Sequence, residues 1–448
     1  MPDLPDNLTE ALIDAALKAG AESADAVAIR GESVIVDMRS GTLEQAERAE
    51  GTDIGLRVLI GGRQANVSGS DSRPETVSAL AERAVAMARE APADPHAGLA
   101  DPAQLGRWRD ATGLDLCDPS DAPAPETLMR MAQEAEAAAL GVAGVSQVQS
   151  ASAAWSRRDM HVAASNGFSG GYARTDTSLS CAAIAGTGAG MERDFDADSR
   201  VFGADLRAPD EIGERAGARA AERIGARRPP TGAWPVLFDE RVAATLIGHL
   251  LTAANGASVA RGGSWLRDRL GTPVLPDALD LHEDPHRPRV SGSRLFDAEG
   301  LPTAPRAIVE AGVLRGFTLD LATARRLGME PTGNAARGTS GPPAPATWNV
   351  ALTQGARSRA DLLREMGTGL LVTSLIGSTI NANTGDYSRG AAGFWVEGGE
   401  IAHPVNECTI AGRLPEMLRR ITPANDARPH LSRVVPSLLV EGLTLAGA

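Results

Sequence analysis

Hydrophobic and polar positions divide the chain into segments of helical and of strand periodicity. The hydrophobic pattern and its capping residues predict helices over residues 7–20, 74–90, 126–140, 209–226 and 239–254. Asn7 is expected to cap the first helix, because Glu10 follows three residues later as in a capping box. Gly20 then provides a C-terminal stop.

Strand patterns lie between and after these helices. Residues 26–30 and 33–37 flank Gly31 and Glu32, and residues 55–60 and 63–68 flank Gly61 and Gly62, which predicts two hairpins. Further strands are expected over three segments, residues 142–150, 153–163 and 170–186. Towards the C-terminus, two segments alternate across a glycine-bearing turn, residues 308–314 and 394–401.

Proline-rich segments give the expected domain organisation. We predict an α+β fold whose N-terminal α+β domain, residues 1–228, has antiparallel sheets with helices on one face. Two helix-and-hairpin units, about residues 1–91 and 125–228, are joined there by a proline-rich linker that wraps the surface. Beyond Pro229-Pro230 helices become rare, which predicts a β-rich C-terminal domain over residues 231–448.

Composition excludes several classes of function. The 448 residues carry a net charge of −13, whereas a nucleic-acid-binding surface needs clustered Lys and Arg, so no nucleic-acid partner is expected. The chain has no apolar run of about 18 residues, which a membrane span requires, and from its acidic, proline-bearing start we expect no signal peptide. Its three cysteines are far apart, which is typical of reduced thiols, and we expect a cytoplasmic protein.

One motif points to a metal site. His282, Glu283 and His286 form a literal H-E-x-x-H, a zinc-binding motif that requires a helix to bring both imidazoles to one face. Pro285 would lie inside that helix, where it removes a hydrogen-bond donor and clashes with the preceding turn. We therefore favour a polar extended loop with exposed histidines over a metal site.

The last third of the chain resembles a known family. The resemblance rests on four segments, residues 369–373, the run Asn383-Thr384-Gly385-Asp386-Tyr387-Ser388-Arg389-Gly390 with its continuation to Glu397, residues 403–405 and residues 409–412. These segments are similar to the C-terminal region of the TldD/PmbA family. Residues 51–58 and 436–447 resemble the N-terminal region and the terminal strand of the same family, so the likeness spans nearly the whole chain.

The resemblance also indicates a branch of that family. TldD-like chains carry an H-E-x-x-x-H zinc motif on a helix near the start of the C-terminal domain and a cysteine ligand near the C-terminus. The matching window here has Ala244, Thr245 and only the final His249, and no cysteine follows Cys408. One imidazole cannot hold a catalytic zinc ion, so we interpret His249 as a packed or hydrogen-bonded histidine. The departure matches the PmbA branch, also called TldE, and implies no catalytic residue and no metal ligand in this chain.

Function follows from the resemblance as an expectation. Such chains pair with a TldD-like, zinc-binding subunit as a heterodimer that acts as a metalloprotease on unfolded peptides, including the leader of a peptide antibiotic. A homodimer of the isolated chain is also plausible. Two alternatives stay open: a stand-alone metallohydrolase using His282, Glu283 and His286, or a non-enzymatic regulator of a topoisomerase or a toxin–antitoxin system.

Six residues are candidates for lining a substrate cavity: Asn383, Thr384, Asp386, Tyr387, Ser388 and Arg389. Asn, Ser and Arg side chains can donate hydrogen bonds to peptide carbonyls. The same composition also suits a turn stabilised by its own side chains. The residues leave both interpretations open.

Overall fold

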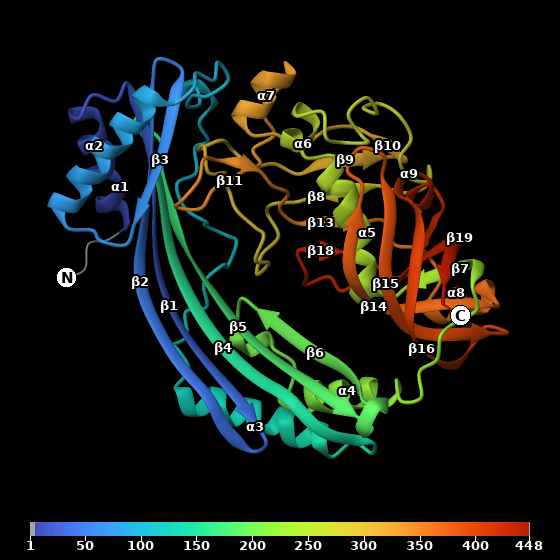
Figure 1. Cartoon of the computed structure of the whole chain (residues 1–448). Helices are drawn as coiled ribbons and strands as arrows, with labels where there is room; N and C mark the ends of the chain where they lie inside the picture. The colour runs from blue at the N-terminus through green and yellow to red at the C-terminus, as the bar shows by residue number, and fades with distance from the viewer. Residues whose placement is uncertain (1–4, 448) are drawn as a thin grey trace.

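A long curved sheet forms the N-terminal part of the molecule (Figure 1). The structure is a computed structural model that describes residues 5–447, apart from the side chain of Ser378. The sheet is antiparallel throughout, in the order β3-β2-β1-β4-β5-β6. Its strands are β1 (Ser23–Arg39), β2 (Thr42–Ile60), β3 (Arg63–Gly69), β4 (Val145–Ala164), β5 (Ser169–Ala185) and β6 (Glu192–Arg200). Strands from both predicted helix-and-hairpin units thus share one sheet.

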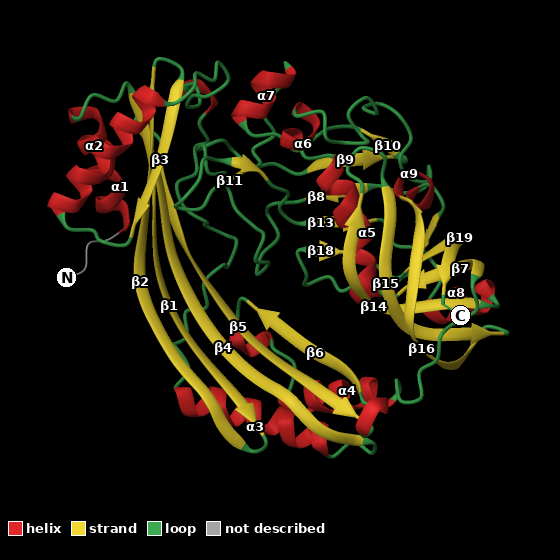
Figure 2. Ribbon diagram, in the orientation of Figure 1, coloured by secondary structure: helices red, strands yellow, loops and turns green. Residues whose placement is uncertain are grey.

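Two helix pairs cover the same face of this sheet. Side chains alternate between faces along a strand, so the parity of a residue number identifies its face. On β1, Ala24, Ala26 and Ala28 pack under α1 (Pro5–Lys18) and α2 (Pro74–Glu90). Val34 and Val36, of the same parity, pack under α3 (Pro125–Leu140) and α4 (Pro209–Ala221). All four helices therefore lie on the convex side of the curve, as Figure 2 shows.

The opposite face meets the proline-rich segment and the C-terminal part. Val27 on β1 and Phe168 pack with Leu114 and Leu116 of that segment and with Phe296. The segment contains the short helix η1 (Pro102–Gln104). Further short 3-10 helices are η2 (Gly188–Gly190) and η3 (Gly203–Asp205). Most of the segment is exposed or half-buried, but Leu114 and Leu116 are buried, so it also packs into this junction.

The C-terminal part contains a six-stranded sheet in the order β16-β15-β14-β7-β19-β17, which closes on itself through β16–β19 pairing. Its strands are β7 (Gly232–Phe238), β14 (Gly369–Ile380), β15 (Asp386–Glu397), β16 (Glu400–Arg413), β17 (Ile421–Pro423) and β19 (Leu438–Ala446). A five-stranded sheet lies beside it, formed by β8 (Leu281–Glu283), β9 (Arg306–Glu310), β10 (Val313–Leu314), β13 (Val350–Leu352) and β18 (Arg433–Val434). A two-stranded ribbon comprises β11 (Ala335–Ala336) and β12 (Ala344–Pro345).

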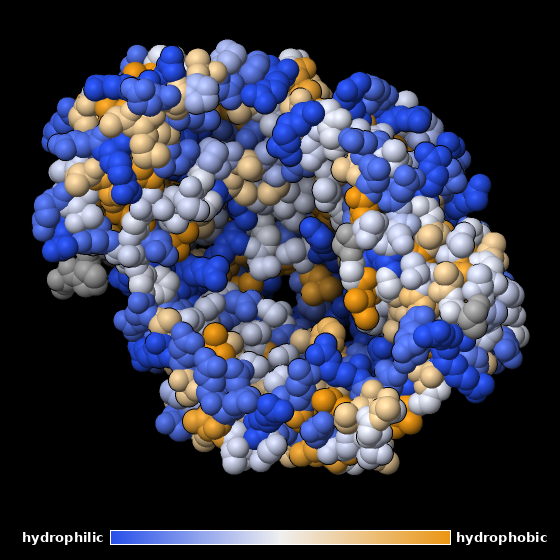
Figure 3. Space-filling model, viewed as in Figure 1, coloured by the Kyte–Doolittle hydropathy of each residue, from blue (hydrophilic) through white to orange (hydrophobic). Residues whose placement is uncertain are grey.

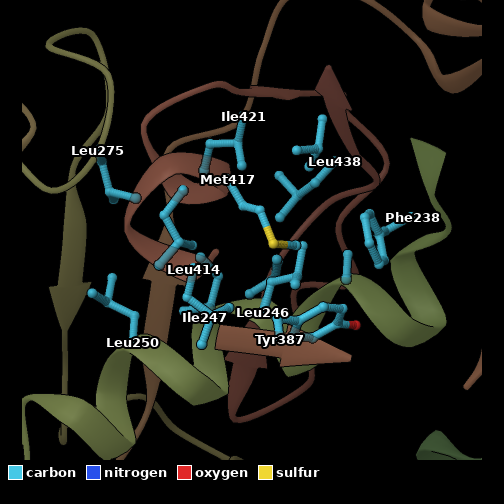
Figure 4. Close-up of a cluster of buried hydrophobic side chains, with 14 of the residues drawn as sticks. Phe238, Leu246, Ile247, Leu250, Leu275, Tyr387, Leu414, Met417, Ile421 and Leu438 are labelled. Carbon is cyan, nitrogen blue, oxygen red and sulfur yellow. The ribbon is translucent and has the colours of Figure 1, made fainter. Parts of the chain in front are cut away.

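The helix α5 (Glu240–Ala253) packs in the hydrophobic core shared by these two sheets (Figure 4). Its Leu246, Ile247 and Leu250 contribute to the same buried cluster as Val372 of β14 and Ile308 of β9. The remaining helices are α6 (Gly256–Ala260), α7 (Leu321–Leu327), α8 (Arg359–Met366) and α9 (Leu414–Leu418). The α+β class, with helices on one face of an antiparallel sheet followed by a β-rich region, is confirmed.

Several local predictions are wrong. Asn7 lies inside α1 rather than at its N-cap. Gly31 and Glu32 form no turn, because β1 runs through them and pairs with both β2 and β4. The two strands expected over residues 142–150 and 153–163 are one strand, β4. The Gly61-Gly62 turn and the hairpins at residues 308–314 and 394–401 are confirmed.

The molecule is hollowed between the long sheet and the C-terminal part, as the space-filling view shows (Figure 3). Among residues 5–447, no helix combines the length and the apolar character that crossing a membrane requires.

Candidate functional site

The helix α5 contains residues 244–249, the segment with Ala244, Thr245 and His249. Asp239 caps it, accepting a hydrogen bond from the backbone N–H of Arg241, and the apolar face of the helix turns into the core. Ala244 packs against the core, and the Thr245 hydroxyl donates to the carbonyl of Val242 at 2.6 Å. Zinc ions in proteins are bound by Cys, His, Asp or Glu, so neither of these two side chains is a usual zinc ligand.

His249 lies against Tyr387 of β15. The two rings stand edge to face with their centroids 5.9 Å apart. The Nε2 atom of His249 and the hydroxyl of Tyr387 are both buried and hydrogen-bond to no described residue. Burial lowers the pKa of His249, and the positive charge of Arg389 lowers it further. Burial also raises the pKa of Tyr387 to about 12, so the phenol stays protonated at neutral pH.

These residues do not fit a zinc ion. A zinc site needs about three protein ligands, and no group of three or more His, Cys, Asp or Glu within residues 5–447 is placed to hold a metal. Arg389 adds a positive charge beside the single imidazole, which opposes a second cation. Cys408, the last cysteine of the chain, is buried, and burial raises the pKa of its thiol to about 11.

The H-E-x-x-H residues do not converge either. Residues 281–283 form the strand β8, so the segment is extended rather than helical, but the expected loop with exposed histidines is wrong for all but His282, since His286 is half-buried. Glu283, which is 1% exposed, pairs with Arg306 at 2.7 Å and accepts from the amide of Asn334 at 3.0 Å. His282 is exposed near Asp280, whereas the Nε2 atom of the half-buried His286 lies 3.1 Å from the Thr303 hydroxyl.

A cavity of about 690 Å³ lies at the turn between β14 and β15. Asn383 and Thr384, two of the six candidate residues, line it. The other lining residues come from the loop after α6 and from the region around α9: Trp265, Arg269, Pro273, Val274, Arg413, Pro415, Glu416, Arg419 and Arg420. The backbone N–H of Trp265 donates to the carbonyl of Ala382 at 2.9 Å, which fixes the loop to the turn.

Gly385 allows these segments to approach one another. Its φ is +75°, in the left-handed region, and a Cβ there would lie 2.7 Å from Cδ of Pro415. Either feature alone favours glycine. The Asn-Thr-Gly-Asp turn of the sequence therefore forms one wall of the cavity because its third residue has no side chain.

The remaining candidate residues divide between the faces of β15. Asp386 is exposed, accepts from the Thr384 hydroxyl at 2.5 Å and lies 3.5 Å from Arg413. Tyr387 is buried in the core, and Ser388 is half-buried. The Nε of Arg389 donates to the carbonyl of Gly377 at 2.7 Å. The turn is thus stabilised by a hydrogen bond of its own, between Thr384 and Asp386, and two of its residues line a cavity.

The arginines of the cavity were missed in the sequence. Arg413, Arg419 and Arg420 bracket α9, and this clustering is visible in the sequence. Their proximity to Arg269 and to Asn383 depends on the tertiary fold, so no local pattern indicates it.

Comparison with known proteins gives matches over nearly the whole chain. The three domain models of the PmbA/TldD type, described as PmbA/TldA metallopeptidase domains, match residues 24–88, 118–224 and 231–447. The metalloprotease PmbA of Escherichia coli O157:H7 is 36% identical over 428 residues, covering 95% of this chain and 92% of that protein.

Solved structures agree with this result. A candidate modulator of DNA gyrase from Bacteroides thetaiotaomicron has a TM-score of 0.91 at 26% identity, covering 99% of this chain and 98% of the other. TldE from Thermococcus kodakarensis has a TM-score of 0.85 at 23% identity, covering 98% and 100%, and at this identity it shows the fold alone.

Proposed function

Because this chain belongs to the PmbA/TldD metallopeptidase family, we propose that it is the subunit without a zinc site in a heterodimeric peptidase. The partner is a TldD-like chain that carries the zinc ion and the residues that act with it. The substrates are unfolded peptides, such as the leader of a peptide antibiotic, and the assembly works in the cytoplasm.

The isolation of His249 is the observation that carries this proposal. At the helix position where the resemblance places a zinc motif, the imidazole faces a tyrosine ring and a nearby guanidinium. A cavity for a metal ion would instead present several electron-pair donors. The polar atoms without a partner here are the Nε2 of His249 and the hydroxyl of Tyr387. Neither of them belongs to a carboxylate or a thiolate, the other usual ligands of zinc.

The hollow between the long sheet and the C-terminal part supports a role in handling peptides. An extended peptide that adds itself as a strand to a sheet edge binds mainly through backbone groups, and this mode requires little sequence specificity. The chain therefore contributes surface to the shared site, and the hydrolytic step takes place on the partner.

Reconstitution tests the proposal. The purified chain is mixed with the H-E-x-x-x-H-bearing chain of the same genome, and hydrolysis of unfolded casein is followed together with zinc content. We expect no hydrolysis by this chain alone, hydrolysis by the mixture, and zinc only in the partner. A His249→Ala variant should support the same rate as the wild type, whereas a Glu→Gln change in the partner's motif should abolish hydrolysis.

The same experiment separates the alternatives. Hydrolysis by this chain alone that is lost in His282→Ala would identify a stand-alone metallohydrolase. A mixture that never hydrolyses casein or short peptides would favour a regulatory protein.

A further inference from the structure

The cavity beside Asn383 has an unbalanced charge. Four arginines and one carboxylate line it, in a chain whose net charge is −13. Glu416 lies 3.1 Å from Arg413, so this arginine already has a counter-ion. The side chains of Arg269, Arg419 and Arg420 make no hydrogen bond or ion pair with any part of the chain that the structure describes. Three guanidinium groups are thus left to meet an anion.

The shape and lining of the cavity indicate more than a small inorganic ion. A second cavity of about 530 Å³ shares Trp265, Arg269 and Asn383 with the first, so the two are adjacent, and Arg267 and Asp268, which also line it, pair with one another. Pro273, Val274 and Pro415 add apolar surface to the lining of the first cavity. Apolar surface next to a few polar groups is typical of sites for organic ligands.

The polar residues of the turn suit a peptide backbone. Asn383 is exposed, and its amide can both donate and accept hydrogen bonds. Guanidinium groups pair with carboxylates through two parallel hydrogen bonds, which a lysine cannot reproduce. The net charge of −13 disfavours a nucleic acid as the ligand.

We propose that this arginine cavity binds the carboxylate groups of an extended acidic peptide, with Arg269, Arg419 and Arg420 as the anion-binding residues. The inference rests on the proposed function in one respect, since it takes the ligand to be a peptide. It deepens that function by giving the chain a preference of its own: segments rich in Asp or Glu, or a peptide's C-terminal carboxylate.

Binding to the isolated chain tests the inference without any partner. Three labelled peptides serve as probes for fluorescence anisotropy at low salt: a blocked peptide of alternating Glu and Gly, its Gln counterpart, and the Gln counterpart with a free C-terminus. We expect the Glu peptide to bind about tenfold or more tightly than the blocked Gln peptide, with an affinity that falls as salt rises. Tighter binding of the free C-terminus than of the blocked Gln peptide would identify the terminal carboxylate as a second ligand for the same arginines.

Two charge-matched double variants locate the contact. Arg419→Gln with Arg420→Gln should weaken binding of the Glu peptide about tenfold. The control, Arg83→Gln with Arg215→Gln, removes two exposed arginines of α2 and α4, which also lack side-chain partners, and should leave binding unchanged. All four positions are exposed, so both variants should fold, which circular dichroism checks.

Equal binding of the Glu and Gln peptides, or equal loss in both double variants, would overturn the inference. Inorganic phosphate that binds as tightly as the Glu peptide and displaces it would assign the cavity to phosphate instead. If the peptides fail this binding test, the reconstitution experiment still tests the heterodimer separately. If reconstitution fails while the Glu peptide still binds, only the heterodimer is rejected.

Discussion

At the scale of single residues, Tyr387 combines deep burial with an unsatisfied hydroxyl. It is 2% exposed and packs beside α5 (Figure 4), and its oxygen has no well-aligned hydrogen bond to a described residue, although the guanidinium of Arg389 lies close to it. Burying a hydroxyl without a partner costs about 1–3 kcal/mol. We therefore expect Tyr387→Phe to raise the free energy of unfolding by about 1 kcal/mol, and Tyr387→Ala to lower it by about 3–5 kcal/mol. Urea denaturation measures both, and a Phe variant less stable than the wild type would reveal a bound partner for the hydroxyl.

The lowered pKa of His249 makes stability depend on pH. Burial, aided by Arg389, keeps the folded imidazole neutral where the unfolded one begins to protonate, near its ordinary pKa of about 6.5. The unfolded state then binds more protons, so the free energy of unfolding falls as pH drops through this range. His249→Gln should reduce that fall, and Arg389→Gln should raise the pKa of His249.

Urea denaturation at a series of pH values, with an NMR titration of the histidine ring protons, checks these expectations. A His249 resonance that titrates at or above the ordinary value would contradict them.

Glu283 shows that a sequence motif indicates a metal site only where the backbone has the helical conformation that the motif requires. It forms a buried ion pair with Arg306, so Glu283→Ala should lower the free energy of unfolding by about 3–5 kcal/mol. His282→Ala, one residue away on the exposed side of β8, should change it by less than about 0.5 kcal/mol. Thermal denaturation of the two variants side by side provides the measurement, and equal effects would argue against a structural role for the glutamate.

At the scale of elements, the turn between β14 and β15 is built around Gly385. An alanine there would need a left-handed backbone and would also collide with Pro415. Gly41, in the turn between β1 and β2, has a similar φ of +72° but nothing within 4 Å of a Cβ. We expect Gly41→Ala to cost about 1 kcal/mol and Gly385→Ala about 2–3 kcal/mol, since only the second adds a clash.

Only Gly385→Ala should also weaken binding of the Glu peptide, because it moves one wall of the arginine cavity. Chemical denaturation and the anisotropy assay measure the two effects. Equal costs at both positions would show that the contact with Pro415 relaxes freely.

Elements with strong local signals were predictable, and those decided by distant partners were not. The helix Pro74–Glu90 and the Gly61-Gly62 turn follow from periodicity and backbone preference alone. Gly31 and Glu32 favour a turn locally, yet neighbours on both sides, β2 and β4, hold them in one extended strand. Tertiary pairing here overrides the local preference.

The candidate site shows the same limit. The position of His249 could be predicted from the family resemblance. Arg389 lies on the same face of β15 as Tyr387, since side chains alternate along a strand, and this places its positive charge near His249. The arginine cavity draws on three segments, around Arg269, Asn383 and Arg419, and the first lies more than a hundred residues before the other two. Charge clustering within a short window does not reveal a site of this kind.

At the scale of the whole molecule, ion pairs join the long sheet to the C-terminal part. Arg241 of α5 lies 3.1 Å from Asp194 of β6. Asp25 on β1 pairs with both Arg57 of β2 and Arg337, which follows β11, and all three side chains are almost fully buried. The carboxylate of Asp25 therefore holds two cations from different parts of the chain. Burial alone would raise the pKa of Asp25, but the two cations outweigh burial and keep this pKa below its ordinary value.

Asp25→Asn tests how far this junction couples the two parts. The variant removes the carboxylate that pairs with two buried guanidinium groups and leaves them near the buried carboxyl of Glu299. Loss of one partner from a buried ion pair costs about 3–5 kcal/mol. Because the repulsion acts across the junction, we expect the long sheet and the C-terminal part to unfold in two calorimetric transitions instead of one. Asp53→Asn, which changes the same charge at an exposed position of β2, should leave a single transition. A single transition in both variants would mean that the apolar contacts around Phe168 and Phe296 suffice to couple the two parts.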